Sequence, residues 1–184
     1  MSGVSLDIDL RPLLAVATKL HGAKKGFPAA INRAVTNAGN QAVKEMQTVL
    51  VPQTGLTKRT MVKAIKGKKG GARFTIASKG GDVRLKFFKP RETASGVTAA
   101  PWSKRRLYNS TFIRSGWWPK RGKPVAGGNV MQRVGGSKYP IRTVRSGLFI
   151  PEEMVSGASQ AAFYGVADRV IPIELERALH AAFG

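Results

Sequence analysis

The sequence contains no cysteine, two histidines and ten acidic residues among its 184 positions. The absence of cysteine excludes disulfides, thiolate metal sites and cysteine nucleophiles. His21 and His180 lie near opposite ends, without a second ligand at metal-binding spacing, so we expect no metal and no other cofactor. The chain has no run of about 20 apolar residues and nothing that resembles a signal peptide, so we expect neither secretion nor membrane insertion.

Groups for acid–base or covalent catalysis are equally scarce. The middle of the chain has only two acids, Asp82 and Glu92, and the many cations around them predict ionised charge partners, not proton carriers. The sequence contains no Walker loop, dinucleotide fingerprint or nucleophile elbow. We therefore expect a protein that is not an enzyme.

Basic residues, in contrast, are abundant and unevenly distributed. The 31 Lys and Arg residues give a net charge of +21. Between Lys58 and Arg145 there are 23 basic residues and two acids, whereas the rest of the chain holds eight of each. This central basic segment predicts contact with a polyanion or with acidic partner surfaces, and solubility alone is the alternative. The candidate contact residues are Lys58, Arg59, Lys66, Lys68, Lys69, Lys104, Arg105, Arg106, Lys120, Arg121 and Lys123.

Tryptophans alternate with these basic residues around positions 102 and 117. Lys and Arg can neutralise phosphates while a tryptophan stacks on a base, as in single-strand binding. Tryptophan and arginine are also favoured at subunit interfaces, and a tryptophan can pack a long loop onto a core. All three interpretations remain open. The candidate interface residues are Trp102, Trp117, Trp118, Arg133 and Tyr139.

The hydrophobic periodicity predicts an α+β fold in one domain over residues 1–184, in which N-terminal helices and a C-terminal helix pack on a mostly antiparallel β-sheet. Alternation over Val4 to Leu10 predicts a strand, followed by a helix that Asp9 caps. A long amphipathic helix is expected from Pro28 until Pro52 stops it, and a shorter one from Thr57 to Ile65.

Further along the chain, short strands are expected at 73–78, 82–89, 107–114, 129–134 and 142–150. Residues 66–71 are expected to form a hairpin-like connector, and residues 90–128 a long basic and aromatic loop region without a clean period. Pro172 is expected to begin the C-terminal helix, because proline is favoured in a first turn.

Four segments resemble a known family. The block NVMQRVGGSKYPI, from Asn129 to Ile141 and followed by an apolar run at 148–151, closely resembles a signature of the tailed-phage minor tail protein Z family. Segments 30–34, 55–61, and 88–91 with Gly96 and Val97 agree in order, so the resemblance covers about residues 27 to 151. Residues 115–128 do not match the family pattern.

The resemblance implies an α+β tail-completion protein without enzymatic activity. Such a protein would assemble into a ring, expected to be a hexamer, and would join the phage tail to the head around the DNA channel. The implied partners are other copies, other tail or neck proteins and possible contact with genomic DNA, in the virion and, during assembly, in the host cytoplasm. Since copies at +21 repel one another, we expect a ring that is stable only in its assembly. A free nucleic-acid-binding protein that uses the segment Lys58 to Arg145 is the alternative.

Overall fold

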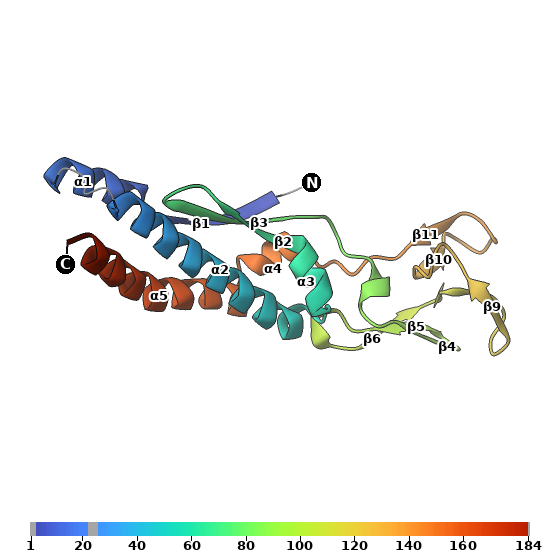
Figure 1. Cartoon of the computed structure of the whole chain (residues 1–184). Helices are drawn as coiled ribbons and strands as arrows, with labels where there is room; N and C mark the ends of the chain where they lie inside the picture. Colours follow the sequence, from blue (N-terminus) through green and yellow to red (C-terminus); the bar gives the residue numbers. More distant parts are fainter. Residues whose placement is uncertain (1–2, 22–25, 184) are drawn as a thin grey trace.

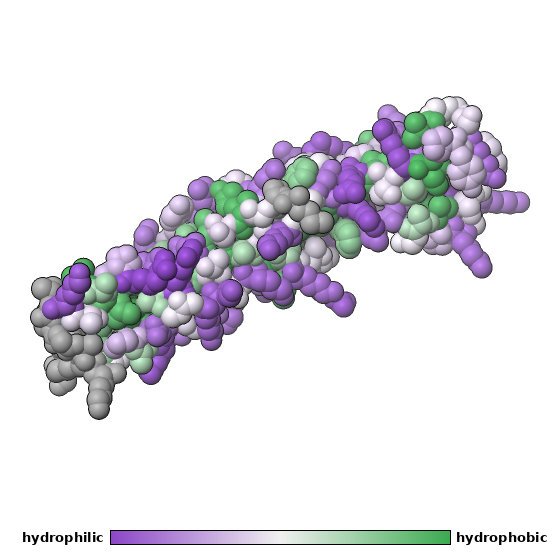
Figure 2. Space-filling view, turned by 90° about the horizontal axis from the view of Figure 1, so that it is seen from above, coloured by the Kyte–Doolittle hydropathy of each residue, from purple (hydrophilic) through white to green (hydrophobic). Residues whose placement is uncertain are grey.

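The structure is a computed structural model that describes residues 3–21 and 26–183. The molecule is elongated: helices gather at one end and short strands at the other (Figure 1). Its accessible surface is 10927 Å², against about 8,600 Å² expected for a compact protein of this mass. On the face shown in Figure 2, hydrophilic residues dominate, and apolar residues appear in small groups, one of them at the strand-rich end.

Two long antiparallel helices make up most of the helical end. They are α2 (Phe27–Thr54) and α5 (Gly157–Phe183). The apolar stripe predicted for α2 is buried, because it packs against α5 and a sheet. Polar contacts also join α2 to α5 outside the apolar stripe: Arg169 pairs with Glu45 at 2.6 Å, and Asn37 donates to Glu174 at 3.2 Å.

Two prolines that were predicted to mark helix boundaries lie inside helices. Helix α2 continues past Pro52 to Thr54 and ends at Gly55, whose φ of 78° is left-handed. Helix α5 begins at Gly157, well before Pro172. Proline removes one backbone donor, but the α5 residues on both sides of Pro172 bury apolar side chains against the core, and this burial outweighs the local cost.

Two shorter predicted helices are confirmed. The first, α1 (Arg11–His21), begins where Asp9 Oδ1 accepts a bond of 3.0 Å from the Arg11 backbone N–H. The second, α3 (Lys58–Ala64), is capped by the side chain of Thr57, which accepts from the Thr60 backbone N–H. The short α4 (Ile150–Met154) precedes α5 and replaces the end of the strand expected at 142–150.

A three-stranded antiparallel sheet covers one side of the helix pair. Its order is β1 (Gly3–Asp9), β3 (Arg73–Lys79) and β2 (Ile65–Lys69). The predicted alternation in β1 is confirmed, with Ile8 buried and its neighbours Asp7 and Asp9 exposed. The segment 66–71, expected as a connector, instead supplies most of strand β2 before the turn.

Four small elements follow β3 along the chain. They are the 3₁₀ turn η1 (Leu85–Phe87), the hairpin strands β4 (Arg91–Thr93) and β5 (Gly96–Ala99), and the turn η2 (Pro101–Ser103). The remaining strands are β6 (Arg106–Asn109), β7 (Thr111–Phe112), β8 (Arg114–Gly116), β9 (Arg121–Pro124), β10 (Met131–Arg133) and β11 (Ile141–Thr143). Together with β4 and β5, these strands form the sheets β4-β5-β6 and β11-β10-β7 and the hairpin β8-β9. We call residues 91–143, which run from β4 to β11 with the turns between the strands, the basic β end, since this segment holds eleven Lys or Arg and one acid, Glu92.

Two predictions for this region were wrong. The expected strand at 82–89 is the 3₁₀ turn η1, because Leu85 and Phe88 are both fully buried at a spacing of three, while Phe87 is 44% exposed. The expected loop region at 90–128 contains six short strands, β4 to β9, and the single strand expected at 107–114 is divided among β6, β7 and the first residue of β8. Strands of two to four residues are too short to display a period of two, and their stability comes from backbone pairing across the chain.

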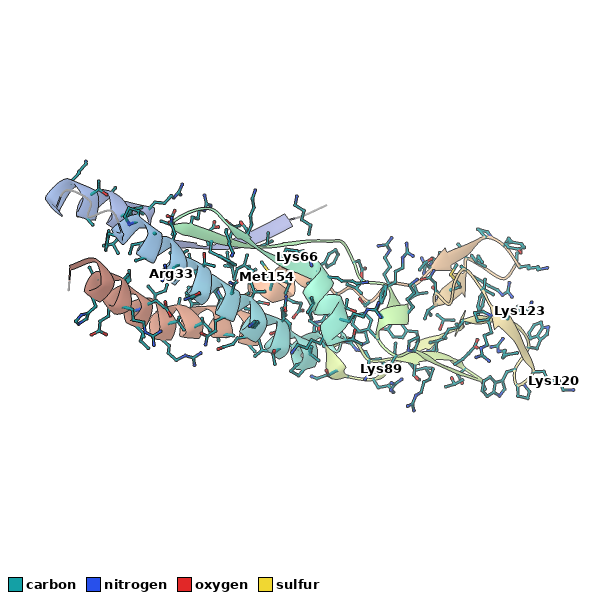
Figure 3. All side chains as sticks on the ribbon, viewed as in Figure 1. Arg33, Lys66, Lys89, Lys120, Lys123 and Met154 are labelled. Carbon is teal, nitrogen blue, oxygen red and sulfur yellow. The ribbon has the colours of Figure 1, made fainter. Side chains whose placement is uncertain are left out.

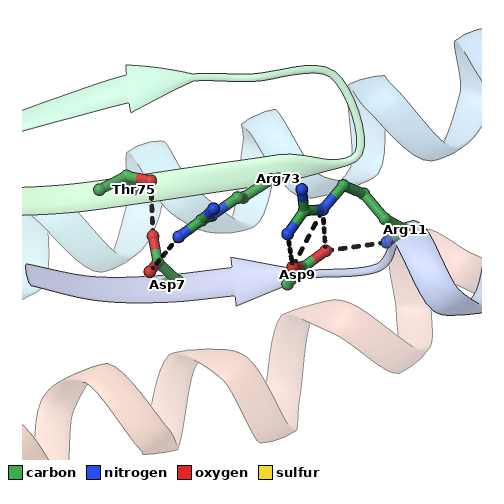
Figure 4. Close-up of polar contacts among 5 residues, drawn as sticks. All are labelled: Asp7, Asp9, Arg11, Arg73 and Thr75. Atoms are coloured by element: carbon green, nitrogen blue, oxygen red, sulfur yellow. Dashed lines mark hydrogen bonds and ion pairs between the residues drawn. The ribbon is translucent and has the colours of Figure 1, made fainter.

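Two aspartates of the edge strand β1 bind neighbouring elements: Asp7 bonds to β3, and Asp9 bonds to the first residue of α1 (Figure 4). Asp7 accepts from Arg73 at 2.7 Å and from Thr75 at 2.5 Å, and these bonds lower its pKa. The Arg11 side chain and backbone lower the pKa of Asp9 from 3.8 to about 2. Both carboxylates therefore stabilise the fold above the unfolded-state pKa and lose this contribution as the pH falls through the folded-state pKa.

We expect the stability of the native protein to fall between pH 4 and pH 2, in part because Asp7 and Asp9 become protonated. The double variant Asp7→Asn and Asp9→Asn is expected to be less stable than the native protein near neutral pH and to lose less stability over this range. Urea unfolding followed by circular dichroism at each pH measures the difference. Parallel curves for the two proteins would contradict this assignment.

Candidate interaction surface

The candidate contact residues lie at separate places along the molecule. Lys58 and Arg59 begin α3, and Lys66, Lys68 and Lys69 lie on β2. Figure 3 shows Lys66 near the middle of the molecule, and Lys120 and Lys123 at the far end. The sequence-predicted basic segment therefore does not fold into one patch. Lys104 and Arg105 follow η2, Arg106 begins β6, and Arg121 and Lys123 both lie on β9.

Arg121 is engaged inside the protein. Its guanidinium pairs with Glu92 at 3.2 Å, and the side chains are only 16% and 10% exposed. Glu92 also accepts from the backbone N–H groups of Ile113 and Arg114. One carboxylate thus joins β4 to the β8-β9 hairpin, which agrees with the predicted role of Glu92 as a charge partner. Arg121 is accordingly a structural residue and not a free contact residue.

Trp102 is also accounted for by contacts within the chain. Its indole N–H donates to Glu153 Oε1 at 2.6 Å, and the Arg106 guanidinium lies 5.3 Å from the centre of its ring. Glu153 Oε2 accepts from Gln53 at 2.8 Å. These bonds join η2, α4 and the end of α2, so Trp102 packs a segment onto the core, one of the three interpretations that the sequence left open. Arg105 similarly donates to Thr98.

The other aromatic candidates are exposed at two hairpin tips of the basic β end. Trp117 and Trp118, in the β8-β9 turn, are 90% and 49% exposed, and Tyr139, in the β10-β11 turn, is 66% exposed. Arg133 supports the second tip, because its guanidinium donates to the Lys138 carbonyl at 2.7 Å and lies 5.2 Å from the Phe112 ring. We call Trp117, Trp118 and Tyr139 the aromatic tips.

A hollow of about 640 Å³ lies between β4 and the β8-β9 hairpin. The Glu92–Arg121 pair forms part of its wall, and Trp118 and Pro119 line the side of the hairpin tip. Arg91 and Arg114 also line it, and neither makes an ion pair with any residue in 3–21 or 26–183. The hollow can therefore receive an acidic or planar group of a partner beside the exposed tryptophans.

The described part of the chain contains no cluster of three or more His, Asp or Glu residues that could hold a metal ion. Within the same residues, no helix is long and apolar enough to cross a membrane.

Asp82, the other acid of the central basic segment, accepts from the Gly147 backbone N–H at 2.8 Å, so it fixes a turn.

The comparisons with known proteins identify no relative: no family model matches the chain, and no curated protein or solved structure matches it.

Sequence reasoning missed the junction at Glu153. Gln53 donates to the Glu153 backbone and side chain, and Gln53 Oε1 accepts from the Ser159 backbone N–H at 3.1 Å. These residues are about 100 positions apart in the sequence, and no local motif relates them. Only the antiparallel packing of α2 and α5 brings them together.

Proposed function

We propose that this chain is a structural protein of a tailed phage, without a catalytic role, which completes the head-proximal end of the tail and joins it to the head. In this proposal it forms part of a ring around the DNA channel. The resemblance of the block from Asn129 to Ile141 motivates the proposal, and that block forms β10 and the hairpin tip with Tyr139.

The distribution of charge and exposed aromatics carries the proposal. The basic β end holds eleven cations against one acid, and that acid is sequestered by Arg121. The neutral terminal segments form α1, α2, α4 and α5, at the other end and along the body. An elongated protein with one cationic, aromatic end is suited to insertion between acidic neighbours or beside DNA, since both would neutralise it.

Free nucleic-acid binding is the second candidate. Trp117 is 90% exposed and Lys120 lies in the same turn, an arrangement that also permits a base to stack while a phosphate is neutralised. Under this alternative, purified protein binds single strands with an affinity that falls steeply as salt rises.

Trp117→Ala is expected to impair tail joining in an infection-complementation assay while changing nucleic-acid affinity by less than about threefold. Under the alternative, loss of one stacking residue weakens single-strand binding by about 1–3 kcal/mol. Tyr164→Ala is the matched control, because Tyr164 is 52% exposed on α5, away from the basic β end.

Purified particles give the second readout. We expect the protein at a fixed copy number per particle, which quantitative mass spectrometry measures. Absence from particles, together with Trp117-dependent strand binding, would reject the structural role in favour of the alternative.

A further inference from the structure

We propose that the ring is built by strand addition: β2 of one copy pairs with β1 of the next copy, so that the three-stranded sheets join edge to edge. This inference rests on the proposed function for the existence of a ring. It adds which surfaces meet, in which direction the copies follow one another, and where the basic β ends lie in the assembly.

Both edges of the sheet are unpaired in the described chain. Strand β1 makes backbone ladder bonds to β3 alone, and from Lys66 onward β2 also pairs with β3 alone. Ile65, the first residue of β2, is engaged elsewhere: its N–H donates to the Met61 carbonyl at the end of α3, and its carbonyl accepts from Gln47. β1 has seven residues and β2 five, long enough for a continuous ladder. Unpaired backbone groups at a sheet edge readily pair with another chain.

The two edges carry opposite charge on the same face of the sheet. The strand register places Asp7, Thr75 and Lys68 in one row across the sheet, and Ser5, Ala77 and Lys66 in the next. Residues directly opposite one another share a face. The solvent face therefore changes from aspartate on β1 to lysine on β2, and no ion pair of Lys66 or Lys68 occurs among the described residues.

This charge arrangement selects one mode of association. Pairing β2 with β2 brings lysines together, and pairing β1 with β1 brings aspartates together, and like charges on neighbouring strands are destabilising. Pairing β2 with β1 brings Lys66 and Lys68 close to Asp7. Asp7 already binds Arg73 and Thr75, but a carboxylate has about four acceptor positions, so it can also accept from a lysine of the next copy.

The strand directions then orient the ring. Since β1 and β2 both run antiparallel to β3, rotation of copies about an axis along the strands makes the new pair parallel. Pairing of unlike edges is heterologous, which generates rings when the rotation closes. In Figure 1, β1 and β3 follow the long axis of the molecule, so all basic β ends project from the same side of the ring.

The cysteine-free sequence allows a direct test by disulfide cross-linking of full-length protein. Two double variants carry Ser5→Cys with Lys66→Cys, or Ser5→Cys with Lys68→Cys. Within one copy Ser5 and Lys66 lie on either side of β3, about 9.6 Å apart, and Lys68 lies still farther from Ser5. Both separations exceed the reach of about 7 Å that a disulfide requires. Mild oxidation in about 0.15 M salt, where long-range repulsion is screened, is expected to trap transient edge pairs of the purified protein as covalent dimers and higher oligomers for at least one variant. A ring without cross-links is still expected to be stable only in its assembly.

The single variants distinguish the alternatives. Each of Ser5→Cys, Lys66→Cys and Lys68→Cys alone is expected to remain monomeric on a non-reducing gel. Dimers from a single variant, without higher oligomers from either double variant, would show pairing of like edges and overturn the proposal. Folded double variants that form no cross-link would also overturn it, with circular dichroism and thermal unfolding reporting the fold.

A charge reversal tests the electrostatic argument. In the variant with Ser5→Cys and Lys68→Cys, adding Lys66→Glu is expected to lower the yield of higher oligomers at least threefold. The matched control adds Lys44→Glu, on the exposed side of α2, and is expected to leave the yield within a factor of 1.5. Equal losses in both would reject the pairing of unlike edges.

The outcomes separate this inference from the proposed function. If purified protein forms cross-linked oligomers but the protein is absent from phage particles, edge pairing is supported and the phage role is rejected. Protein present in particles at fixed copy number, without cross-links in either double variant, keeps the phage role and rejects edge pairing.

Discussion

Gly39→Ala is expected to destabilise the protein by about 1–3 kcal/mol, although a Gly→Ala substitution at a solvent-exposed position of a helix normally stabilises that helix. Gly39 lies inside α2, and an added Cβ would lie 2.2 Å from Cγ of Phe74, whose ring is 2% exposed. The ring cannot withdraw, because it is enclosed between α2 and Gly67 of β2, where a Cβ would lie 2.6 Å from it. The cost of overpacking therefore exceeds the gain of up to about 1 kcal/mol in helix propensity.

Gly165→Ala is the matched control in α5. Apart from the adjacent residues and backbone of α5 itself, nothing lies within 4 Å of its added Cβ, so we expect a gain of about 0.5–1 kcal/mol. Urea unfolding of both variants measures the two signs directly. Stabilisation by Gly39→Ala would mean that α2 and the sheet pack less closely than the structure indicates.

Glu92→Ala is expected to cost about 3–5 kcal/mol of local stability in the basic β end, because it leaves a largely buried guanidinium without its carboxylate partner and with only the Gly116 carbonyl as an acceptor. The backbone N–H groups of Ile113 and Arg114 lose an acceptor as well. We expect amide exchange to accelerate throughout β7 to β9 and the fluorescence of Trp117 and Trp118 to change. Helices α2 and α5 are expected to retain their protection, since the Glu92 side chain bonds to Arg121, Ile113 and Arg114, and none of these residues belongs to α2 or α5.

Glu176→Ala serves as the control, because it removes one acidic charge from an exposed position on α5. Its effect is expected to stay within about 0.5 kcal/mol. If both variants change exchange in β7 to β9 equally, the effect comes from net charge and the structural role of Glu92 is rejected.

Local patterns in the sequence were sufficient where one periodic segment faces one core. The stripe on α2, the alternation in β1 and the short helix that begins near Thr57 each belong to a single element, and each was predicted correctly. The prediction failed where packing overrides a local preference, as at Pro172 in α5. It also failed for β4 and β5, whose pairing joins Arg91 to Thr98 through backbone bonds that any residues can make.

The candidate surface shows the same division at single residues. Lys120 and Arg121 are adjacent basic residues with the same sequence context, and both were predicted contacts. Lys120 is exposed at a hairpin tip, whereas Arg121 pairs with Glu92, 29 positions earlier in the chain. Trp102 and Trp117 differ in the same way, since Trp102 binds Glu153 and Trp117 is 90% exposed.

The sequence by itself determined the α+β class, the long helix and the concentration of positive charge in the central segment, because composition and periodicity are local properties of the chain. Tertiary structure alone decided which cations remain free, which tryptophans are exposed and which sheet edges carry opposite charge. These depend on contacts between residues far apart in the sequence, such as Glu92 with Arg121 and Asp7 with Arg73. The largely buried Glu92 and Arg121 need partners because burial of a charge requires one, and for both pairs the fold alone determines which partner is within reach.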